Sequence, residues 1–437
     1  MRQCPVWKMV AMVGGLVLMA ARSVQAQPLK VFILAGQSNM QGHVNVSTFP
    51  YMADDPKTAP ILKEMLNARG KPKVLQNVWI ASIGCAGNDT TEQKGKLTTG
   101  FGAGPGEIGP EFTFGIYIEK LLGGPVLLIK TSWGGKSLNT DFRPPSAGPY
   151  VWNHYALEQL KLRHENVAQA KAAKIKATGV YYRLMIKYVR KVLANIKRVD
   201  PQYNPKQGYE LAGFIWFQGW NDYVDNWTYP NNHKPGGYDQ YSRLMAMLIN
   251  DVRKDLSAPH MPFVIGALGV DGVHHANKPM LYFRQAEAAP ALLPQFKGNV
   301  AVVKTAPYWD DKLEALFTRY QGYWPKVNAE AAAEKNTSWN NKLRLMRENF
   351  TPEELKQLKG MSAFDFHYLG AAKIMAPIGK AFAEAAAKLD KKTQLPVVTR
   401  TSLKPIVMRP IHLNHAPKAG TPSTPQPMLT APPTRLP

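Results

Sequence analysis

Short runs rich in β-branched, aromatic and other apolar residues recur along the chain. Strands of a parallel sheet are buried on both faces, so they appear as continuous apolar runs rather than as an alternation of apolar and polar residues. We therefore predict six buried strands, at residues 30–34, 74–80, 126–130, 211–217, 263–265 and 300–304.

Longer segments with helical character separate these runs. Residues 157–196 are rich in Ala, Lys, Leu and Arg and predict one or two helices, residues 238–256 carry apolar side chains at helical spacing, and residues 370–389 predict an Ala-rich closing helix. Alternation of buried strands with helices is typical of a three-layer α/β/α sandwich. We therefore predict an α/β fold of flavodoxin-like type with a central, mostly parallel sheet.

The two ends of the chain differ in composition from the rest. Residues 1–26 combine a basic start, an apolar run and small residues before a cleavage position, which predicts a secretory signal peptide. The apolar run is shorter than the roughly 20 residues that span a bilayer, so we expect no stable membrane insertion after cleavage. Residues 391–437 have no acidic residue and many prolines, and predict a basic, mostly disordered tail.

The remaining segment, residues 27–390, is the predicted globular domain. Within it, residues 90–107 are rich in Gly and Thr, and residues 310–356 carry many charges. We interpret both as insertions, which in α/β enzymes often lie over the active site. Cys85 would be the only cysteine after signal cleavage, so the domain has no intrachain disulfide, and we expect Cys85 to be a small buried residue.

The chain is strongly basic. Lysine and arginine number 54 against 31 acidic residues, which gives a formal charge of +23. Such a charge favours acidic partners. For a protein exported to the periplasm or the medium, an anionic polysaccharide is a better candidate than nucleic acid. The sequence does not indicate an oligomeric state.

The first predicted strand is followed by Gly36-Gln37-Ser38-Asn39-Met40. A serine at the carboxyl end of such a strand lies where ligands collect in open α/β sheets, and it is nucleophilic if a base is near. The same serine could instead be a helix cap. The glycine spacing differs from the Gly-x-Ser-x-Gly elbow of α/β-hydrolases, because Met40 occupies the position of the second Gly.

Two further strand ends carry groups that could stabilise an oxyanion. Gly134 and Gly135 follow the strand at 126–130, and a glycine amide there could donate to a developing negative charge. The strand at 211–217 runs into Gln218-Gly219-Trp220-Asn221-Asp222, in which either Gln218 or Asn221 could donate from its amide. His367 lies just before the closing helix, where a histidine can act as general base towards Ser38.

Taken in chain order, these segments resemble the SGNH (GDSL-like) hydrolases, and in particular the sialate O-acetylesterase and acetyl xylan esterase branch. The matching blocks extend over roughly residues 30–389. They are Gly36-Gln37-Ser38-Asn39, Gly109-Pro110-Glu111, Trp133-Gly134-Gly135, Trp216-Phe217-Gln218-Gly219 and His367.

The resemblance implies a role for each matched residue. Ser38 would be the nucleophile and His367 its base, while the oxyanion hole would comprise the Ser38 amide, a glycine amide at Gly134 or Gly135, and the Gln218 side chain. Glu111 would brace the site. We further predict that Trp133, Trp220, Asn221 and Asp222 contact the substrate, with the tryptophans stacking on sugar rings.

Two positions depart from the family pattern. Trp220 stands where the family often has Glu, and Phe364 stands where members commonly place the triad Asp, three residues before the histidine. Asp365 is therefore our candidate for the third triad member, with Asp222 or a Ser-His dyad as alternatives.

The resemblance implies a secreted or periplasmic serine esterase that removes O-acetyl groups from carbohydrates through an acetyl-serine intermediate, without metal or organic cofactor. A non-catalytic carbohydrate-binding protein, or a lipase or thioesterase of the same superfamily, are the alternative interpretations.

Overall fold

The computed structural model describes residues 27–85, 88–393 and 396–398. Residues 1–26 and 399–437 lie outside this range, so the predicted signal peptide and nearly all of the predicted tail stay predictions. Close to the start of that tail, Val398 forms an antiparallel bridge with Tyr209. No helix in the described ranges is both long enough and apolar enough to cross a bilayer.

A seven-stranded sheet forms the centre of the molecule, in the order β4-β3-β6-β1-β7-β8-β9. All neighbouring strands are parallel except β4, which pairs antiparallel with β3 at one edge. The strands are β1 (Leu29–Gly36), β3 (Val78–Ile83), β4 (Glu92–Lys96), β6 (Val126–Ser132), β7 (Tyr209–Phe217), β8 (Phe263–Ala267) and β9 (Val300–Lys304). The predicted mostly parallel α/β sandwich is thereby confirmed. A separate two-stranded ribbon joins β2 (Val44–Asn45) and β5 (Glu107–Ile108).

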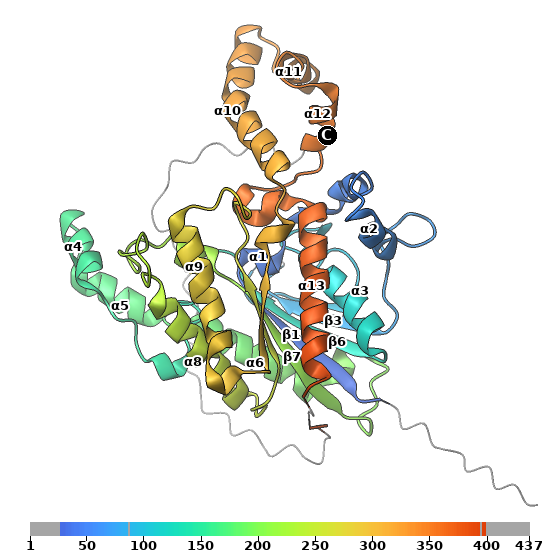
Figure 1. Cartoon of the computed structure of the whole chain (residues 1–437), viewed down its shortest axis with the longest axis vertical. Coiled ribbons are helices and arrows are strands. Elements are labelled where there is room, and N and C mark those ends of the chain that lie inside the picture. Colours follow the sequence, from blue (N-terminus) through green and yellow to red (C-terminus); the bar gives the residue numbers. More distant parts are fainter. Residues whose placement is uncertain (1–26, 86–87, 394–395, 399–437) are drawn as a thin grey trace, which may run out of the picture.

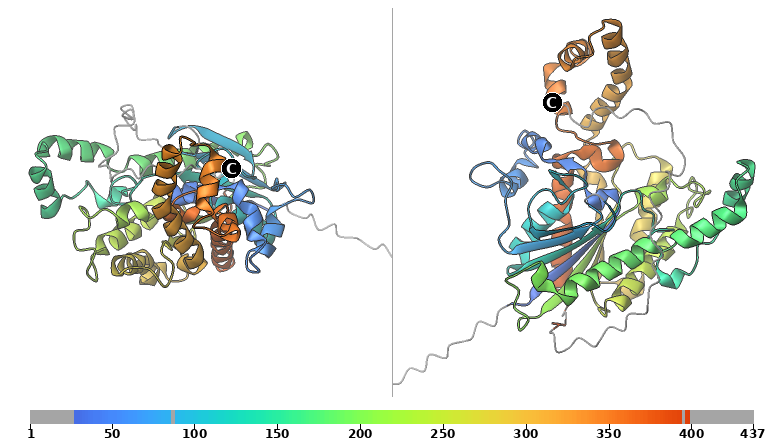
Figure 2. Two further views of the ribbon diagram at one scale, coloured as in Figure 1. Left: turned by 90° about the horizontal axis from the view of Figure 1, so that it is seen from above. Right: turned by 180° about the vertical axis from the view of Figure 1, so that it is seen from behind.

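Helices cover both faces of the sheet (Figure 1). On one face α3 (Glu111–Leu122) packs against α13 (Ala372–Asp390), and on the other lie α6 (Val180–Ala194), α8 (Asp239–Asp255) and α9 (Lys278–Ala288), an arrangement that Figure 2 shows from two further directions. Lys30 Nζ of β1 contacts Glu210 of β7 at 2.6 Å and Asp390 of α13 at 3.0 Å, which ties the closing helix to the central strands.

Three predicted segments have different bounds or structure from those expected. The second strand is β3, which starts at Val78 rather than at residue 74. Residues 157–196 form three helices instead of one or two: α4 (His154–Leu162), α5 (Val167–Ala177) and α6. The supposed insertion at 90–107 contributes β4 to the sheet; its residues are only partly buried because it is an edge strand.

The charged segment after β9 leaves the body of the molecule as a helical arm (Figure 1). It comprises α10 (Asp311–Ala333), α11 (Trp339–Met346) and α12 (Pro352–Leu358). The remaining helices are short: α1 (Ser38–Gln41), α2 (Ala59–Met65), α7 (Trp220–Tyr223), and the 3-10 turns η1 (Val46–Met52), η2 (Pro145–Ala147), η3 (Ile196–Arg198), η4 (Ala289–Leu292), η5 (Pro294–Phe296), η6 (Ala306–Tyr308) and η7 (Asp365–Gly370).

Candidate active site

Ser38 is the first residue of α1, directly beyond the carboxyl end of the central strand β1. The turn between them needs glycine at position 36, because a Cβ there would lie 2.1 Å from the carbonyl oxygen of Phe217. This close approach brings the end of β1 against the end of β7. Ser38 is 7% exposed, and its Oγ lies 3.4 Å from Nε2 of Gln37.

Gln37 joins the nucleophile segment to the segment after β7. Its side chain is buried, and its Oε1 accepts hydrogen bonds from Nε2 of Gln218 at 3.3 Å and from the amides of Gly219 at 3.4 Å and Asn221 at 3.2 Å. The Gln37 side chain therefore fixes the end of β1 to the end of β7, which gives the Gln of the Gly-Gln-Ser-Asn block a structural role.

Asp222 is a buried centre of hydrogen bonding. Its carboxylate accepts from the amides of Leu138 at 2.6 Å and Asn139 at 3.0 Å, from Nε2 of Gln218 at 2.7 Å, and from the hydroxyl of Tyr229 at 3.0 Å. Burial raises its pKa to about 6. The four hydrogen bonds stabilise the charged carboxylate and so oppose this rise. Asp222 has no exposed surface, which argues against substrate contact, and none of its donors within the described residues is His367, which argues against a triad role. Its position favours bracing of the loop after β6.

Three backbone amides at this edge of the sheet have no hydrogen-bond acceptor among the described residues. Within the described residues, no hydrogen bond occupies the amides of Ser38, Gly134 and Gly135. Gly134 and Gly135 are exposed, and Gly135 has φ +73°, a conformation that favours glycine. These are the properties that oxyanion donors require.

The amide side chains of Gln218 and Asn39 differ in whether they are available to donate to an oxyanion, and not in the way the sequence predicted. Nε2 of Gln218 already donates to Asp222 and to the carbonyl oxygen of Lys136 at 3.1 Å. Asn39, by contrast, is buried beside the nucleophile, and neither polar atom of its side chain has a partner among the described residues. Asn39 is therefore an additional candidate donor, which the sequence marked only as part of a motif.

His367 lies in η7, a turn of unusual backbone conformation. The next two residues, Tyr368 and Leu369, have φ of 55° and 58°, which is rare for non-glycine residues and strained for bulky ones. The hydroxyl of Tyr368 holds the turn in place: it lies 2.7 Å from Oγ1 of Thr305 and accepts from the amide of Gly269 at 2.8 Å.

A second histidine, absent from the sequence prediction, stacks on His367. The ring of His43 lies parallel to that of His367, with centroids 3.9 Å apart and planes 7° apart. Burial lowers the pKa of His367 to about 3 and, together with the charge of Lys130, that of His43 to about 4. Both rings are therefore neutral near pH 7, and a neutral His367 is the form that can accept a proton. In the sequence, His43 is distinguished only by its position five residues after Ser38.

Lys130 belongs to a fully buried ion pair. Its Nζ contacts Oε2 of Glu111 at 2.7 Å and also donates to the carbonyl oxygens of Gln41 at 2.8 Å and Phe101 at 2.7 Å. Glu111 further accepts from the amide of Gly109 at 2.9 Å. With its carboxylate fully engaged, Glu111 braces the segment after α1, which agrees with the role expected for it.

Asp365 turns towards its own loop. Its Oδ1 accepts from the amide of Phe366 at 2.9 Å, and burial and the nearby charge of Glu314 raise its pKa. No hydrogen bond reaches the ring of His367 in the part of the chain described here. The ring instead has aromatic neighbours, since Phe366 meets it edge to face at 4.5 Å.

The two predicted sugar-stacking tryptophans have different environments. Trp133 is 1% exposed and donates from Nε1 to the carbonyl oxygen of Asp89 at 2.9 Å, so it supports the loops and offers no stacking face. Trp220 is half-buried and stacks on Phe366 at 5.5 Å, and Phe366 stacks on Phe364 at 5.3 Å. The resulting aromatic row includes Phe364, the sequence position at which a triad Asp was expected.

Other reactive groups are unsuited to the chemistry. Cys85 is buried, as predicted, and burial raises the pKa of its thiol. One group among the described residues has the composition of a metal site: the ligand atoms of His275, Asp311 and Glu314 lie within 4.8 Å of one another. These side chains pair among themselves, with Nδ1 of His275 3.4 Å from Oε2 of Glu314, and we assign no ion to them.

The stacked histidines predict a pH-dependent stability. Unfolded, each ring binds a proton below about pH 6.5, whereas His43 in the fold does so only below about 4. The unfolded state therefore binds more protons between these values, and stability is lost as the pH falls through this window. We expect His43→Leu to reduce this loss by up to about 1.4 kcal/mol per pH unit, measured by urea denaturation between pH 7 and 4.5. An equal slope for the wild type and His43→Leu would contradict it, and exposed His260→Leu is the control.

Comparison with known proteins gives one family match. A family model described as carbohydrate esterase, sialic acid-specific acetylesterase, matches residues 28–313, which include Ser38, Gly134, Gly135 and Gln218 but end before His367. No curated protein gives a significant match.

Solved structures similar to this chain share little sequence with it. They include a protein from Arabidopsis thaliana (17% identity, 64% of this chain and 86% of that one, TM-score 0.35) and a carbohydrate acetylesterase from Xanthomonas citri (14%, 62% and 49%, TM-score 0.36). NanS is a third (12%, 64% and 79%, TM-score 0.34). Because the family model covers well over half of the sequence, the chain belongs to the carbohydrate esterase family of the sialic acid-specific acetylesterase type.

Proposed function

We propose that the protein hydrolyses O-acetyl esters of carbohydrates with Ser38 as nucleophile and His367 as general base. The observation that carries the proposal is the stack of His43 on His367, because it brings the segment that follows Ser38 against the turn that bears the base. The amides of Ser38, Gly134 and Gly135 at the same edge of the sheet have no acceptor among the described residues, and they would supply the donors that an oxyanion needs.

In this mechanism Oγ of Ser38 attacks the acetyl carbonyl carbon while His367 takes the hydroxyl proton. The negative charge on the carbonyl oxygen is held by the Ser38 amide and a glycine amide, with the Asn39 or Gln218 side chain as a further donor. Collapse breaks the ester bond, and His367 returns the proton to the leaving sugar oxygen. Water then attacks the acetyl-serine with His367 as base, acetate leaves, and Ser38 regains its proton.

The base acts in this proposal without a carboxylate partner. We expect Asp365→Asn to lower kcat by less than tenfold, because the Asp365 carboxylate is bonded to the Phe366 amide. A true triad carboxylate would cost about 10⁴-fold. The measurement is kcat for 4-nitrophenyl acetate from pH 5 to 8, with His367→Ala as the reference for loss of the base. A loss near that of His367→Ala would restore Asp365 to the triad.

Acetate release tests the proposed function directly. The panel is acetylated xylan, pectin, sialic acid and sulfated glycan, with long-chain esters to identify a lipase or thioesterase. We propose that the protein acts outside the cytoplasm, on the pattern of residues 1–26, and that its charge of +23 favours acidic glycans. Absence of acetate from every glycan, with binding retained, would identify a carbohydrate-binding protein instead.

A further inference from the structure

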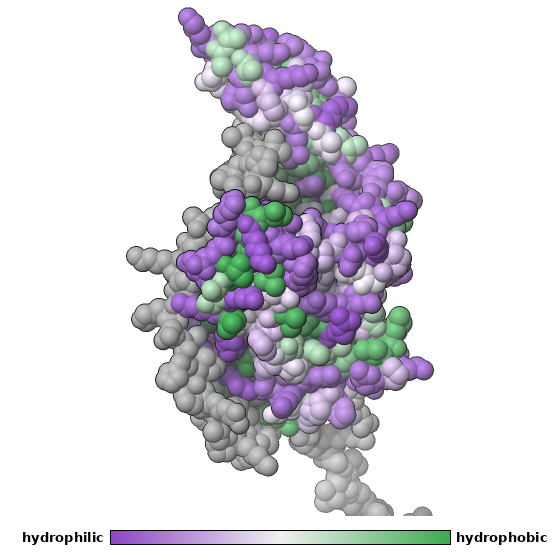
Figure 3. Space-filling view, turned by 90° about the vertical axis from the view of Figure 1, so that its left-hand side faces the viewer, coloured by the Kyte–Doolittle hydropathy of each residue, from purple (hydrophilic) through white to green (hydrophobic). Residues whose placement is uncertain are grey.

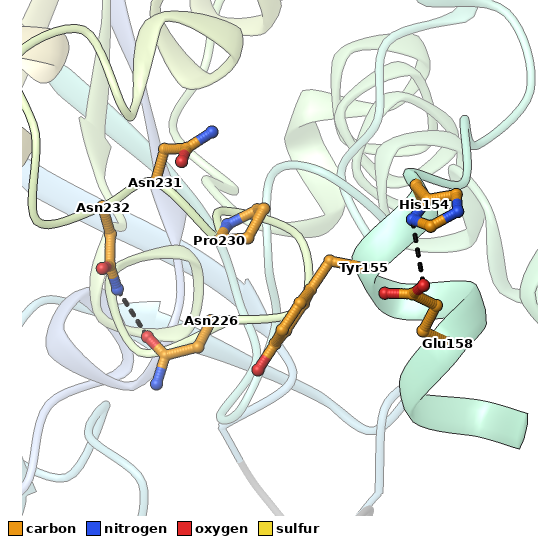
Figure 4. Close-up of a pocket in the computed structure, with 7 residues that line it drawn as sticks. All are labelled: His154, Tyr155, Glu158, Asn226, Pro230, Asn231 and Asn232. Carbon is orange, nitrogen blue, oxygen red and sulfur yellow. Dashed lines mark hydrogen bonds and ion pairs between the residues drawn. The ribbon is translucent and has the colours of Figure 1, made fainter. Parts of the chain in front are cut away.

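A groove separates α4 from the loop that joins α7 to α8 (Figure 4). Its volume is about 680 Å³, which is within the range of sites for small organic ligands. Residues from both sides line it: His154, Tyr155, Glu158, Asn226, Pro230, Asn231 and Asn232. None of them belongs to the candidate active site.

Hydrogen bonds hold both walls of the groove in place. Asn153 caps α4 through its Oδ1, and its Nδ2 donates to the carbonyl oxygens of Trp227 at 2.7 Å and Thr228 at 3.2 Å. The guanidinium of Arg163, just beyond α4, lies 4.5 Å from the ring centroid of Trp227. Asp225 accepts from the amides of Trp227 and Thr228 and so rigidifies the loop. A preformed site loses less entropy when it binds.

The lining is suited to hydroxyl groups. Oδ1 of Asn226 accepts from Nδ2 of Asn232 at 2.5 Å, which leaves the Asn226 amide nitrogen to donate. The exposed side chain of Asn231 makes no hydrogen bond within the described residues. Amides supply donors and acceptors together, as sugar hydroxyls require. Tyr155 points from α4 towards the Asn226 loop and is 41% exposed, which offers a ring against the C–H face of a sugar.

Charge narrows the ligand class. Among the described residues that line the groove there is one carboxylate, Glu158, which lies 3.4 Å from Nδ1 of His154, and no lysine or arginine. A uronate or sulfate would be repelled by this carboxylate and would gain no electrostatic attraction from the lining residues. The face that carries α4 and α5 mixes hydrophilic surface with small hydrophobic patches (Figure 3), which suits an open contact with a polymer.

We propose that this groove binds an uncharged, hydroxyl-rich sugar unit of the substrate polymer, separate from the unit that is deacetylated. The inference rests on the proposed function. The groove is linked to the candidate active site through the loop between α7 and α8, because Tyr229, next to Pro230, donates to Asp222. The groove would raise affinity for a polymer without changing the chemistry at Ser38.

The test uses the full chain and three variants. Tyr155→Ala removes the ring, Tyr155→Phe keeps it, and Leu162→Ala changes a 71% exposed side chain at the other end of α4. Binding of unacetylated hexasaccharides of xylose, glucose and mannose is measured by calorimetry, with hexagalacturonate as the anionic probe. We expect Tyr155→Ala to weaken binding of a neutral hexasaccharide at least tenfold and to raise KM for the matching acetylated polymer similarly. Turnover of 4-nitrophenyl acetate should stay unchanged.

Two results would overturn the groove assignment. One is unchanged binding and polymer KM in Tyr155→Ala; the other is binding of hexagalacturonate alone. Equal losses in Leu162→Ala would also count against it, since that side chain lies outside the groove. Failure of the wild type to hydrolyse 4-nitrophenyl acetate would refute the proposed esterase instead, and hexasaccharide binding would still decide the role of the groove.

Discussion

Ser38→Ala is expected to lower kcat for acetate release by about 10⁴-fold to 10⁶-fold, because it removes the atom that forms the acyl intermediate. The residual rate would come from the oxyanion donors and substrate binding, which the substitution leaves in place. KM should change little, since Ser38 is only 7% exposed and contributes little contact area. Acetate release from the preferred glycan in single-turnover and steady-state assays measures the loss.

Accumulation of the intermediate gives an independent check. Wild type treated with 4-nitrophenyl acetate and quenched in acid should carry one acetyl group on the peptide that contains Ser38, detectable by mass spectrometry, and Ser38→Ala should carry none. Ser38→Ala is a small change next to Gln37, so thermal unfolding should confirm an intact fold. An acetate release rate within tenfold of the wild type would show that another group is the nucleophile.

The fold was largely predictable, because parallel strands buried on both faces leave a direct pattern in the sequence. Residues 126–130 and 211–217 lie within β6 and β7, at whose ends the structure places the oxyanion candidates. The edge strand β4 left no such pattern: it reads Glu-Gln-Lys-Gly-Lys, since an edge strand needs backbone pairing but little burial.

The site was predictable as a set of strand ends but not as a set of contacts. Motif order made Ser38 and His367 the candidate nucleophile and base, while the stacking of His43 on His367 depends on how two segments far apart in sequence meet. The sequence could not distinguish a half-buried from a fully buried tryptophan, so Trp220 and Trp133 received the same role. Nor could it show that the amide of Gln218 is already engaged.

Asp222 gives the second large expected effect, and it separates bracing from chemistry. Asp222→Ala would remove the acceptor of four donors in a buried site. Nε2 of Gln218 keeps its bonds to Lys136 and Gln37, so three donors are left without a partner: the amides of Leu138 and Asn139 in the loop after β6 and the hydroxyl of Tyr229. Each unsatisfied buried group costs about 1–3 kcal/mol, so we expect the free energy of unfolding to fall by about 3–5 kcal/mol. Because that loop follows Gly134 and Gly135, kcat should also fall, by about 10²-fold.

Graded variants keep this prediction testable if Asp222→Ala does not fold. Tyr229→Phe removes one of the four donors and should cost about 1 kcal/mol with little loss of kcat. Asp222→Asn keeps the size of the side chain but presents a donor where the carboxylate accepts. Its losses of stability and of kcat should lie between those of Tyr229→Phe and Asp222→Ala. Urea denaturation and kcat for 4-nitrophenyl acetate are measured on the same samples. If stability fell across this series while kcat stayed within threefold of the wild type, Asp222 would hold the fold together without positioning the oxyanion donors.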